Sequence, residues 1–304
     1  MEGEFLKWLR PRLPAHPSLE VGVGSDAAVL KLPSRRAVVT TDALMDGVDF
    51  VLADADPARV GRKALAVNLS DLAAMGARPV AAFISLMLPR AGALELAQGL
   101  YAGLLPLAER FQVAVAGGDT NTWNGPLAVS ITAIGEPPPK GAWTRAAGRP
   151  DDWIMVTGPL GGSLLSHHFD FEPRVNLACA IADQYAIHAA TDISDGLSLD
   201  LSHILSESGC GAVLEIPVIP IAPAAYQMSA AYPAGPTPLD RALGDGEDFE
   251  LILTAAPDEA RRLQADPILG PQLTRIGKLS ARPGLWRRDA EGVETPLVPR
   301  GYQH

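Results

Sequence analysis

Apolar residues between positions 57 and 76 recur every three or four residues, which is the spacing of one face of an α-helix. Asp56 suits the N-cap position and Pro57 the first helical position, while Gly76 suits the end of the helix. Asn68 and Asp71 lie three residues apart, so both project from one helix face beside the apolar stripe. The stripe consists of Val60, Ala64, Val67 and Met75. The pattern therefore predicts a buried helix that carries polar side chains next to its apolar face.

Shorter apolar runs, bounded by glycine, proline or aspartate, predict strands on both sides of this helix. In the first half, the expected strands are 27–32, 37–41, 80–88, 112–116 and 127–134, and a second helix is expected at 94–110. In the second half, the expected strands are 153–157, 212–216 and 249–254, with an amphipathic helix at 197–208. Because helices and strands are mixed in both halves, the expected fold class is α/β (α+β).

A proline-rich segment divides the chain. Residues 136–141 contain three consecutive prolines, which neither continue a helix nor pair well in a sheet. The length of 304 residues also suits about two domains. We therefore expect an N-terminal domain at 1–138 and a C-terminal domain at 139–304.

Composition narrows the range of functions. The net charge of −10 argues against nucleic-acid and anionic-membrane partners, which require a basic surface. The most apolar stretch, residues 64–88, is interrupted by polar residues and a proline, so it does not resemble a membrane span. The N-terminus has no apolar signal core, which predicts a cytoplasmic protein. The 2 cysteines form no CxxC pair, so neither a disulfide framework nor a structural zinc site is expected.

Six aspartates stand at the edges of apolar or glycine-rich runs, where folding would withdraw their carboxylates from water. A carboxylate in such a place remains ionised only if it is paired, hydrogen-bonded or bound to a cation. Few basic residues lie beside these aspartates in the sequence, and Mg²⁺, which prefers oxygen ligands and accompanies substrate phosphates, is the simplest compensation. The pattern therefore predicts a phosphate-handling site. The six residues are Asp26, Asp42, Asp71, Asp119, Asp192 and Asp195.

Phosphoryl transfer between two anions fits such a site. This reaction is limited by charge repulsion and positioning, which bound Mg²⁺ and oriented donors relieve. A phosphate monoester acceptor has a second pKa near ~6 and is largely dianionic at neutral pH, so no dedicated catalytic base is required. Transfer would instead be supported by Asp42, Asp71 and Asp119. The adjacent hydroxyls suited to binding metal ions or phosphate oxygens are those of Thr40, Thr41 and Ser194.

Three further features allow anion binding and also have plain structural interpretations. Gly117 and Gly118 suit close approach of a phosphate or a hairpin turn. The turn at 158–163 suits anion contact or helix–sheet packing, and it is not a Walker A motif because no lysine follows. Arg145 suits bidentate phosphate binding or solvent exposure. The histidines lack metal-ligand spacing, and no covalent nucleophile motif is present.

Taken together, six segments resemble the thiamine-monophosphate kinases, a family within the aminoimidazole-ribonucleotide-synthetase-like ATP-binding superfamily. The long helix motif is highly specific, and the glycine turns are specific in combination. The resemblance spans most of the chain. The segments are residues 24–28, 40–42, 63–77, 117–120, 192–197 and 246–251.

The resemblance implies Mg²⁺-dependent transfer of the ATP γ-phosphate onto thiamine monophosphate, which gives thiamine diphosphate and ADP. It also implies a homodimer in which the N-terminal domain, a sheet with helices, pairs through its sheet. A C-terminal α/β sandwich domain would complete the nucleotide and substrate site. The implied Mg²⁺ ligands are Asp26, Thr40, Thr41, Asp42, Asp71, Asp119, Asp192 and Asp195. The implied ATP contacts are Gly118, Asp119, Arg145 and Ser194, and Glu247 would contact the acceptor.

Four departures from the family pattern affect the nucleotide and acceptor sites. Asp49 stands where the family usually has a substrate-contacting histidine, and residues 121–125 replace an expected Thr-Arg-Gly. The connection at 163–174 is shorter than usual. Tyr302 stands where the family commonly places an aromatic ring over the thiamine. Asp49 and Tyr302 therefore join Glu247 as expected substrate contacts.

Two other functions stay open from the sequence. One is a related ATP-dependent synthetase or kinase of the same superfamily with a different acceptor. The other is a non-catalytic nucleotide or thiamine-phosphate binding protein, which is suggested by Asp49 and by Trp123 in the replaced segment.

Overall fold

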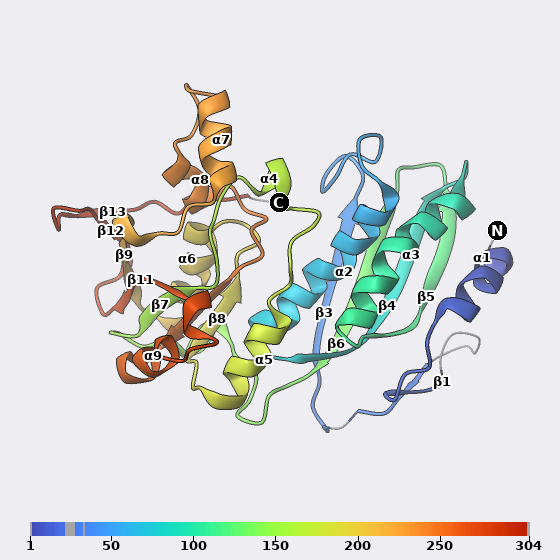
Figure 1. Ribbon diagram of the computed structural model, residues 1–304, viewed down its shortest axis with the longest axis horizontal. Helices are drawn as coiled ribbons and strands as arrows, with labels where there is room; N and C mark the ends of the chain where they lie inside the picture. Colours follow the sequence, from blue (N-terminus) through green and yellow to red (C-terminus); the bar gives the residue numbers. More distant parts are fainter. Residues whose placement is uncertain (1, 22–27, 33, 303–304) are drawn as a thin grey trace. The chain divides into compact units, whose positions relative to one another are not determined.

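The computed structural model describes residues 2–21, 28–32 and 34–302, in which the chain forms two compact units (Figure 1). One unit comprises Met1–Leu72 and Ala77–Pro137, and the other comprises Ala73–Gly76 and Pro138–His304. Both combine helices with sheets, which confirms the predicted α/β class. No helix in the described part of the chain is long and apolar enough to cross a membrane.

The first unit is built on a four-stranded sheet in the order β3-β6-β4-β5. Strands β3 and β4 both pair antiparallel with β6, whereas β4 and β5 are parallel and are connected by α3. Helices α2 and α3 lie over one face of this sheet (Figure 1). The elements are α1 (Glu2–Leu9), η1 (Arg10–Arg12), β1 (Leu19–Val21), β2 (Val29–Leu30), β3 (Val38–Met45), α2 (Pro57–Ala74), β4 (Arg78–Pro89), α3 (Ala93–Arg110), β5 (Ala114–Trp123) and β6 (Ala128–Glu136).

The two faces of this sheet differ because side chains alternate along each strand. In β6, Val129, Ile131 and Ala133 are buried, while the residues between them are only partly buried. In β3 the alternate residues Val39 and Met45 are 61% and 45% exposed. The sheet therefore packs one face against helices and leaves apolar side chains exposed on the other.

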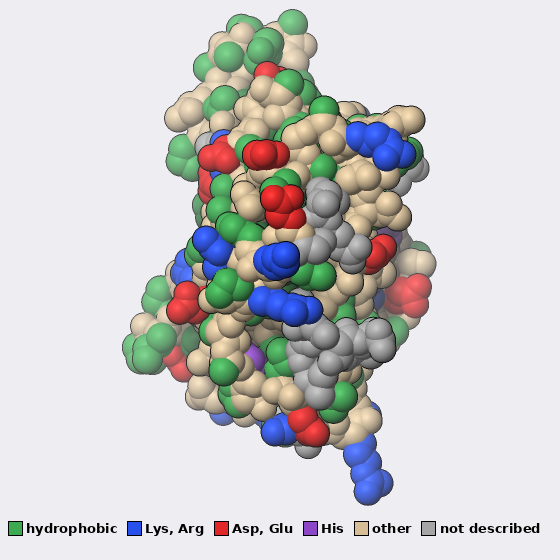
Figure 2. Space-filling view, turned by 90° about the vertical axis from the view of Figure 1, so that its right-hand side faces the viewer, with side chains coloured by type: hydrophobic (Ala, Val, Ile, Leu, Met, Phe, Trp, Pro, Cys, Tyr) green, Lys and Arg blue, Asp and Glu red, His purple; other side chains and the backbone are tan. Residues whose placement is uncertain are grey.

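A cavity of about 390 Å³ lies between η1 and the C-terminal half of α3. Its lining combines apolar side chains, including Leu13 and Leu105, with Arg12 and His16. Figure 2 shows the side of the molecule that carries the N-terminal helix, where Lys and Arg side chains lie beside hydrophobic ones. None of the site residues predicted from the sequence lines this cavity.

The second unit is built on a seven-stranded sheet in the order β13-β12-β9-β11-β7-β10-β8. All neighbouring strands are antiparallel except β12 and β9. The elements are η2 (Arg145–Ala147), β7 (Trp153–Val156), α4 (Ser163–Ser166), α5 (Val175–Gln184), β8 (Ala189–Asp192), α6 (Leu197–Ser208), β9 (Gly211–Glu215), η3 (Ile216–Val218), α7 (Pro223–Ala231), α8 (Pro238–Gly244), β10 (Leu251–Ala255), α9 (Pro257–Gln264), η4 (Gly270–Gln272), β11 (Thr274–Ser280), β12 (Gly284–Arg288) and β13 (Glu294–Pro296).

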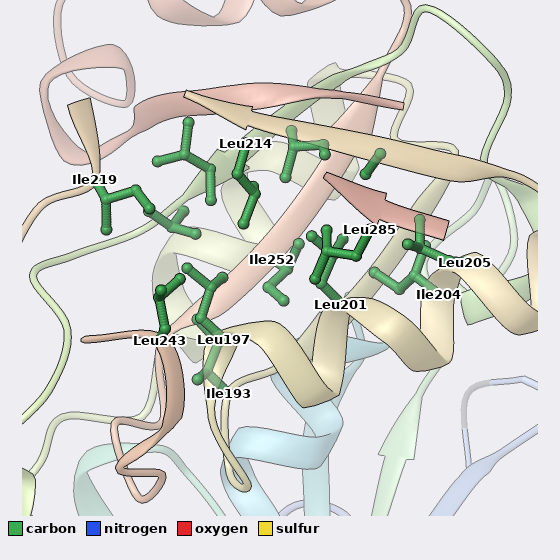
Figure 3. Packing of buried hydrophobic residues seen from close by; sticks show 14 of the residues in the cluster. Ile193, Leu197, Leu201, Ile204, Leu205, Leu214, Ile219, Leu243, Ile252 and Leu285 are labelled. Carbon is green, nitrogen blue, oxygen red and sulfur yellow. The ribbon is translucent and has the colours of Figure 1, made fainter. Parts of the chain in front are cut away.

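Helix α6 supplies the centre of the second unit's core. Its apolar residues recur at helical spacing, and they pack against the sheet. Figure 3 shows Leu197 and Leu201 of α6 facing Ile252 of β10 and Leu285 of β12. The helix begins at Leu197 and ends before Gly209, which adopts the left-handed conformation at φ 64°. The helix predicted at 197–208 is therefore confirmed, and it anchors the loop that precedes it.

The sequence did not predict β1, β8, β11, β12 and β13, and three of the predicted strands differ clearly from the observed ones. β5 continues to Trp123 instead of ending at 116, because its pairing with β4 runs on through Gly118 and Asp119. The Gly-Gly segment is thus part of a strand, and a hairpin turn there is wrong. β3 continues past residue 41 to Met45. In the described part of 27–32, only Val29–Leu30 forms a strand.

Two glycines allow helices α2 and α3 to approach closely. A Cβ atom added to Gly103 would lie 1.7 Å from the backbone oxygen of Ala58, and one added to Gly61 would lie 1.9 Å from that of Leu100. These distances exclude any side chain larger than a hydrogen atom. The contact fixes the position of α2, which carries Asp71.

Gly103→Ala should destabilise the protein by about 1–3 kcal/mol, since the added methyl group forces the two helices apart. Helix propensity alone predicts the opposite, a gain of up to about 1 kcal/mol. Urea denaturation measures the difference, and Ala102→Ser, at the neighbouring exposed position, should change stability by less than about 0.5 kcal/mol. A Gly103→Ala protein as stable as the wild type would contradict the proposed close contact.

Candidate active site

Strand β3 and helix α2 bring two of the predicted aspartates together in the first unit. Thr40 and Asp42 are two residues apart on β3, so their side chains project from the same face of the strand. The Thr40 hydroxyl donates a 2.5 Å hydrogen bond to Oδ2 of Asp71 on α2. Asp71 and Asp42 interact directly, through charge and a side-chain hydrogen bond. The sequence prediction that these carboxylates converge is thus supported for this pair.

The environment of Asp42 is unfavourable for a second negative charge. Burial, and then the charge of Asp71, raises the pKa of Asp42 from 3.8 to about 7. Oδ2 of Asp42 is buried and has no hydrogen-bond partner among the described residues. Oδ1 of Asn68, one helical turn before Asp71, is likewise buried without a partner in the described part of the chain. A carboxylate oxygen that lacks a donor and lies beside a second carboxylate suits a hard divalent cation, so the Asp42–Asp71 pair fits Mg²⁺.

Gly118 lies in the same row across the sheet as Asp42. The row runs from Asp42 through Ile131 and Ile84 to Gly118. Gly118 has φ 153°, and a Cβ atom there would lie 1.8 Å from the backbone oxygen of Ile84. Asp119 falls in the next row, opposite Ser85, and is exposed. The glycine thus allows β5 to lie close to β4 at the point where the predicted nucleotide contacts begin.

Thr41 and Asp49 have local partners in the structure. Thr41 accepts a 3.1 Å hydrogen bond from the Thr132 hydroxyl, and it alternates with Thr40 and Asp42 along β3. The Asp49 carboxylate accepts a 2.7 Å hydrogen bond from the backbone N–H of Met45. Their assignments to metal and substrate stay predictions. Because the Asp49 charge also contributes to the raised pKa of Asp42, it adds to the negative potential here.

In the second unit, Asp192, Ser194 and Asp195 lie at the junction of β8 and α6. Asp192 is buried, at 3% exposure, at the end of β8. The backbone N–H groups of Asp195 and Gly196 donate hydrogen bonds of 3.0 and 2.9 Å to Oδ2 of Asp200. Asp200, which the sequence analysis did not select, therefore fixes the shape of this loop. Burial, and then the charge of Asp195, raises the pKa of Asp200 to about 7.

Arg145 lies beside this junction, within the second unit. Its Nε donates a 3.1 Å hydrogen bond to the Thr191 hydroxyl in β8. Its charge also acts on Asp200, where it lowers the pKa and so opposes part of the effect of burial. The guanidinium group is therefore held beside Thr191, the residue that precedes Asp192, and it retains other donors for a ligand.

A second loop, residues 244–250, carries the predicted acceptor contact Glu247. Gly246 and the non-glycine residues Glu247 and Phe249 have positive φ angles of 74°, 55° and 50°. Non-glycine residues rarely adopt this conformation unless their surroundings force it. Backbone N–H groups of Glu247 and Phe249 donate hydrogen bonds of 2.7 and 2.8 Å to Ser194 and Ile193. The loop is thus tied to the Asp192–Asp195 junction.

The glycine turn at 158–163 binds carboxylates of the protein itself. The N–H of Gly161 donates to Oδ1 of Asp248 at 2.9 Å, and that of Gly162 donates to Oδ2 of Asp245 at 3.0 Å. Of the two interpretations of this turn, the structure favours internal packing, because these donors are already used. The sequence analysis missed Asp245 and Asp248, which appear in the acidic run after Gly244.

The C-terminal segment lies against the same junction. The N–H of Tyr302 donates a 3.0 Å hydrogen bond to the backbone oxygen of Asp195. Ser198 bonds both the oxygen and the N–H of Arg300, at 2.8 and 2.9 Å. The Tyr302 side chain is 51% exposed. Its backbone is therefore fixed beside the predicted metal ligand Asp195, while its ring remains accessible.

The predicted aspartates that the structure describes are distributed over the two units. No group of three or more histidine, cysteine, aspartate or glutamate side chains in residues 2–21, 28–32 and 34–302 is arranged to hold a metal ion. Asp26 lies outside the described residues. Asp42 and Asp71 belong to the first unit, and Asp192 and Asp195 to the second. Among these aspartates, Asp42 and Asp71 are in direct contact, and their role as metal ligands stays a prediction.

Comparison with family models identifies two domains. Residues 24–136 match the N-terminal domain of AIR synthase related proteins, and residues 157–286 match the C-terminal domain of the same proteins. Each of the two observed units thus corresponds mainly to one of the matched domains.

Curated relatives match nearly the whole chain. The thiamine-monophosphate kinase of Rhodopirellula baltica is 45% identical over 314 residues, which cover 100% of this chain and 97% of the relative. The enzyme of that name from Escherichia coli K12 is 36% identical, covering 94% of this chain and 92% of the relative.

Solved structures agree with these matches. A thiamine-monophosphate kinase from Stenotrophomonas maltophilia has a TM-score of 0.79 and 33% identity over 92% of this chain and 94% of its own. AaThiL complexed with AMPPCP and TMP has a TM-score of 0.78 and 28% identity over 93% of this chain and 91% of its own. The hydrogenase maturation protein HypE of E. coli shares the fold at a TM-score of 0.79, with 19% identity over 98% of each chain.

Asp248 should make stability depend on pH. Burial is the main cause that raises its pKa from 3.8 to about 8, so the folded state retains a proton that the unfolded state has released between these values. The stability contributed by protonated Asp248 is complete below pH 3.8 and is lost as pH rises through about 8. The slope is at most about 1.4 kcal/mol per pH unit.

Denaturation of wild type and Asp248→Asn between about pH 5 and pH 8 measures this effect. The variant resembles the protonated acid and should lose stability less steeply than the wild type as pH rises. Asp266→Asn is the control: hydrogen bonds from the N–H groups of Leu269 and Ile268 lower the pKa of Asp266, so its replacement should leave the slope in this range unchanged. Parallel curves for the wild type and Asp248→Asn would exclude a protonated Asp248.

Proposed function

This chain belongs to the thiamine-monophosphate kinase family of AIR synthase related proteins, and we propose that it transfers the γ-phosphate of ATP onto thiamine monophosphate. The products are thiamine diphosphate and ADP. The family supports the reaction type, and the structural observation that carries the proposal is the Asp42–Asp71 pair with the buried, unpartnered oxygen of Asp42. A site that handles two anions must contain cations, and this pair is arranged to hold one.

Mg²⁺ would be held by Asp42 and Asp71, with Thr40 beside them. When bound, it would neutralise charge on the phosphates and lower the repulsion between donor and acceptor. Asp42, Asp71 and Asp119 thus support transfer, and no side chain is required as a base because the acceptor phosphate is already ionised. The further metal ligands of the proposal are Asp26, Thr41, Asp119, Asp192 and Asp195.

The nucleotide and the acceptor are assigned to different residues. Gly118 and Asp119 on β5 would contact ATP, together with Arg145 and Ser194. Arg145 is supported by its fixed place beside β8, from which its remaining guanidinium donors can reach a phosphate. Thiamine monophosphate would contact the other set, which consists of Asp49, Glu247 and Tyr302.

The proposal includes a homodimer formed through the four-stranded sheet. The face of this sheet opposite α2 and α3 exposes apolar side chains, among them Val39 and Met45. An exposed apolar sheet face of this kind suits burial against a second copy. The proposal places the protein in the cytoplasm, since it uses ATP as the phosphate donor. Its net charge of −10 supports a protein that binds neither nucleic acid nor membrane.

Asp71→Asn should lower thiamine diphosphate formation by at least about a hundredfold, because it removes one charge from the metal-binding pair. The assay supplies ATP, Mg²⁺ and thiamine monophosphate and measures thiamine diphosphate and ADP. Asp54→Asn, an exposed aspartate in the same acidic loop region as Asp49, is the control and should retain wild-type activity.

Two outcomes would count against the proposal. ADP formation by the wild type only with another acceptor would overturn the substrate and retain the chemistry. ATP binding without turnover on any acceptor would identify a binding protein, which the anionic Asp49 near the site also suits.

Mg²⁺ should raise the melting temperature of the wild type by several degrees at about pH 8, where Asp42 is ionised in the absence of metal. Asp42→Asn should lose most of this increase, because the variant keeps the shape of the side chain and removes its charge. Differential scanning fluorimetry with and without EDTA measures the change. An equal increase in Asp42→Asn would show that the metal binds elsewhere.

A further inference from the structure

The segment 163–174, which comprises α4 and the connection to α5, contacts the Glu247 loop in matching order. At one end, the Ser163 hydroxyl donates a 2.5 Å hydrogen bond to the backbone oxygen of Gly246. At the other end, Arg174 forms a bidentate ion pair with Glu250, donating from Nε at 2.7 Å and from a second guanidinium nitrogen. Both ends of the connecting segment are therefore attached to the loop that carries Glu247.

Two contacts lie between these ends. The Phe171 ring stacks on that of Phe249, with centroids 4.0 Å apart and an interplanar angle of 16°. Nδ1 of His168 lies 3.1 Å from Oε2 of Glu247. These four contacts follow the same order along the segment and along the loop, so the segment acts as a brace for the loop.

The backbone of Glu247 is fixed independently of its side chain. Its positive φ of 55° is held by the hydrogen bond from its N–H to Ser194. The side chain still has three rotatable bonds, so holding the carboxylate in one orientation costs conformational entropy. His168 and Glu247 are 15% and 27% exposed as side chains, so their contact is shielded from water but accessible to a ligand.

We propose that His168 is a positioning residue, which holds the Glu247 carboxylate in the orientation that receives the acceptor. The inference rests on the proposed function, in which Glu247 contacts thiamine monophosphate. His168 acts through Glu247 and does not touch the reacting phosphates. Its ring packs on Phe169, with centroids 4.1 Å apart, which limits its own movement.

His168→Ala should raise the KM for thiamine monophosphate about tenfold and change kcat by less than about threefold. His168→Asn, whose amide nitrogen can take the place of Nδ1, should restore KM to within about threefold of the wild type. His188→Ala is the matched control. Nδ1 of His188 lies 2.8 Å from Oδ2 of Asp152, and the two side chains are 18% and 3% exposed, so this pair resembles that of His168 and Glu247. Removal of the His188 ring should leave the KM unchanged.

A double-mutant cycle separates positioning from a general structural role. In a Glu247→Gln background, His168→Ala should change KM by less than about twofold, because the group on which it acts is already altered. Calorimetric titration with thiamine monophosphate gives the same comparison without turnover. If His168→Ala proves unstable, His168→Gln, which displaces the donor, gives the same readout.

Failure of the inference and failure of the function are distinguishable. An active wild type with an unchanged KM in folded His168→Ala, or with the full tenfold effect retained in the Glu247→Gln background, overturns the role of His168 alone. A wild type that neither binds nor phosphorylates thiamine monophosphate overturns the proposed function and this inference together.

Discussion

The withdrawal of carboxylates from water is the constraint on which both units depend. In the first unit, Asp42 and Asp71 approach each other at a place where one carboxylate oxygen has no donor among the described residues. Two such charges repel one another, and burial increases the free-energy cost of ionising both. The arrangement is stable when one carboxylate is protonated or when a cation lies between them. Because the fold holds the two carboxylates together before any ion binds, such a site favours binding of a divalent cation.

The second unit meets the same constraint with its own backbone. Its buried carboxylates accept hydrogen bonds from N–H groups of glycine-rich turns, as Asp248 does from Gly161 and Asp200 does from Gly196. These carboxyl groups accept from backbone N–H groups of the kind that bind phosphate in many nucleotide-binding loops. The turns are therefore closed by the protein, and a nucleotide must be bound by other donors. The two acidic regions thus differ in how their buried carboxyl oxygens are satisfied: those of Asp248 and Asp200 accept from backbone N–H groups, whereas Oδ2 of Asp42 has no partner among the described residues.

The sequence was most informative where periodicity and local chemistry agree. Helix α2 and its polar face were predictable because the stripe of apolar residues and the caps lie within one segment. The pairing of Asp42 with Asp71 followed from the cost of burying charge. The continuation of β5 through Gly118 was not predictable, because it depends on pairing with β4, a partner distant in sequence. Asp248 was missed for the same reason, since its partner Gly161 becomes adjacent only on folding. Asp200 bonds the N–H groups of Asp195 and Gly196 just before it, and no sequence motif indicated that contact.

The loop that carries Glu247 shows why parts of the site could not be predicted from the sequence: its conformation depends on segments that are distant in the chain. Glu247 and Phe249 adopt the left-handed backbone conformation although neither is a glycine, so the sequence does not indicate it. Such strain persists only where the surrounding contacts offset its free-energy cost. Those contacts come from the loop after β8 and from the brace at 163–174. In that segment, His168 is placed 3.1 Å from Glu247 and Phe171 stacks on Phe249. Under the proposed function, His168 is the residue of this segment that contacts Glu247. The sequence does not indicate this contact, because the two segments are far apart in the chain.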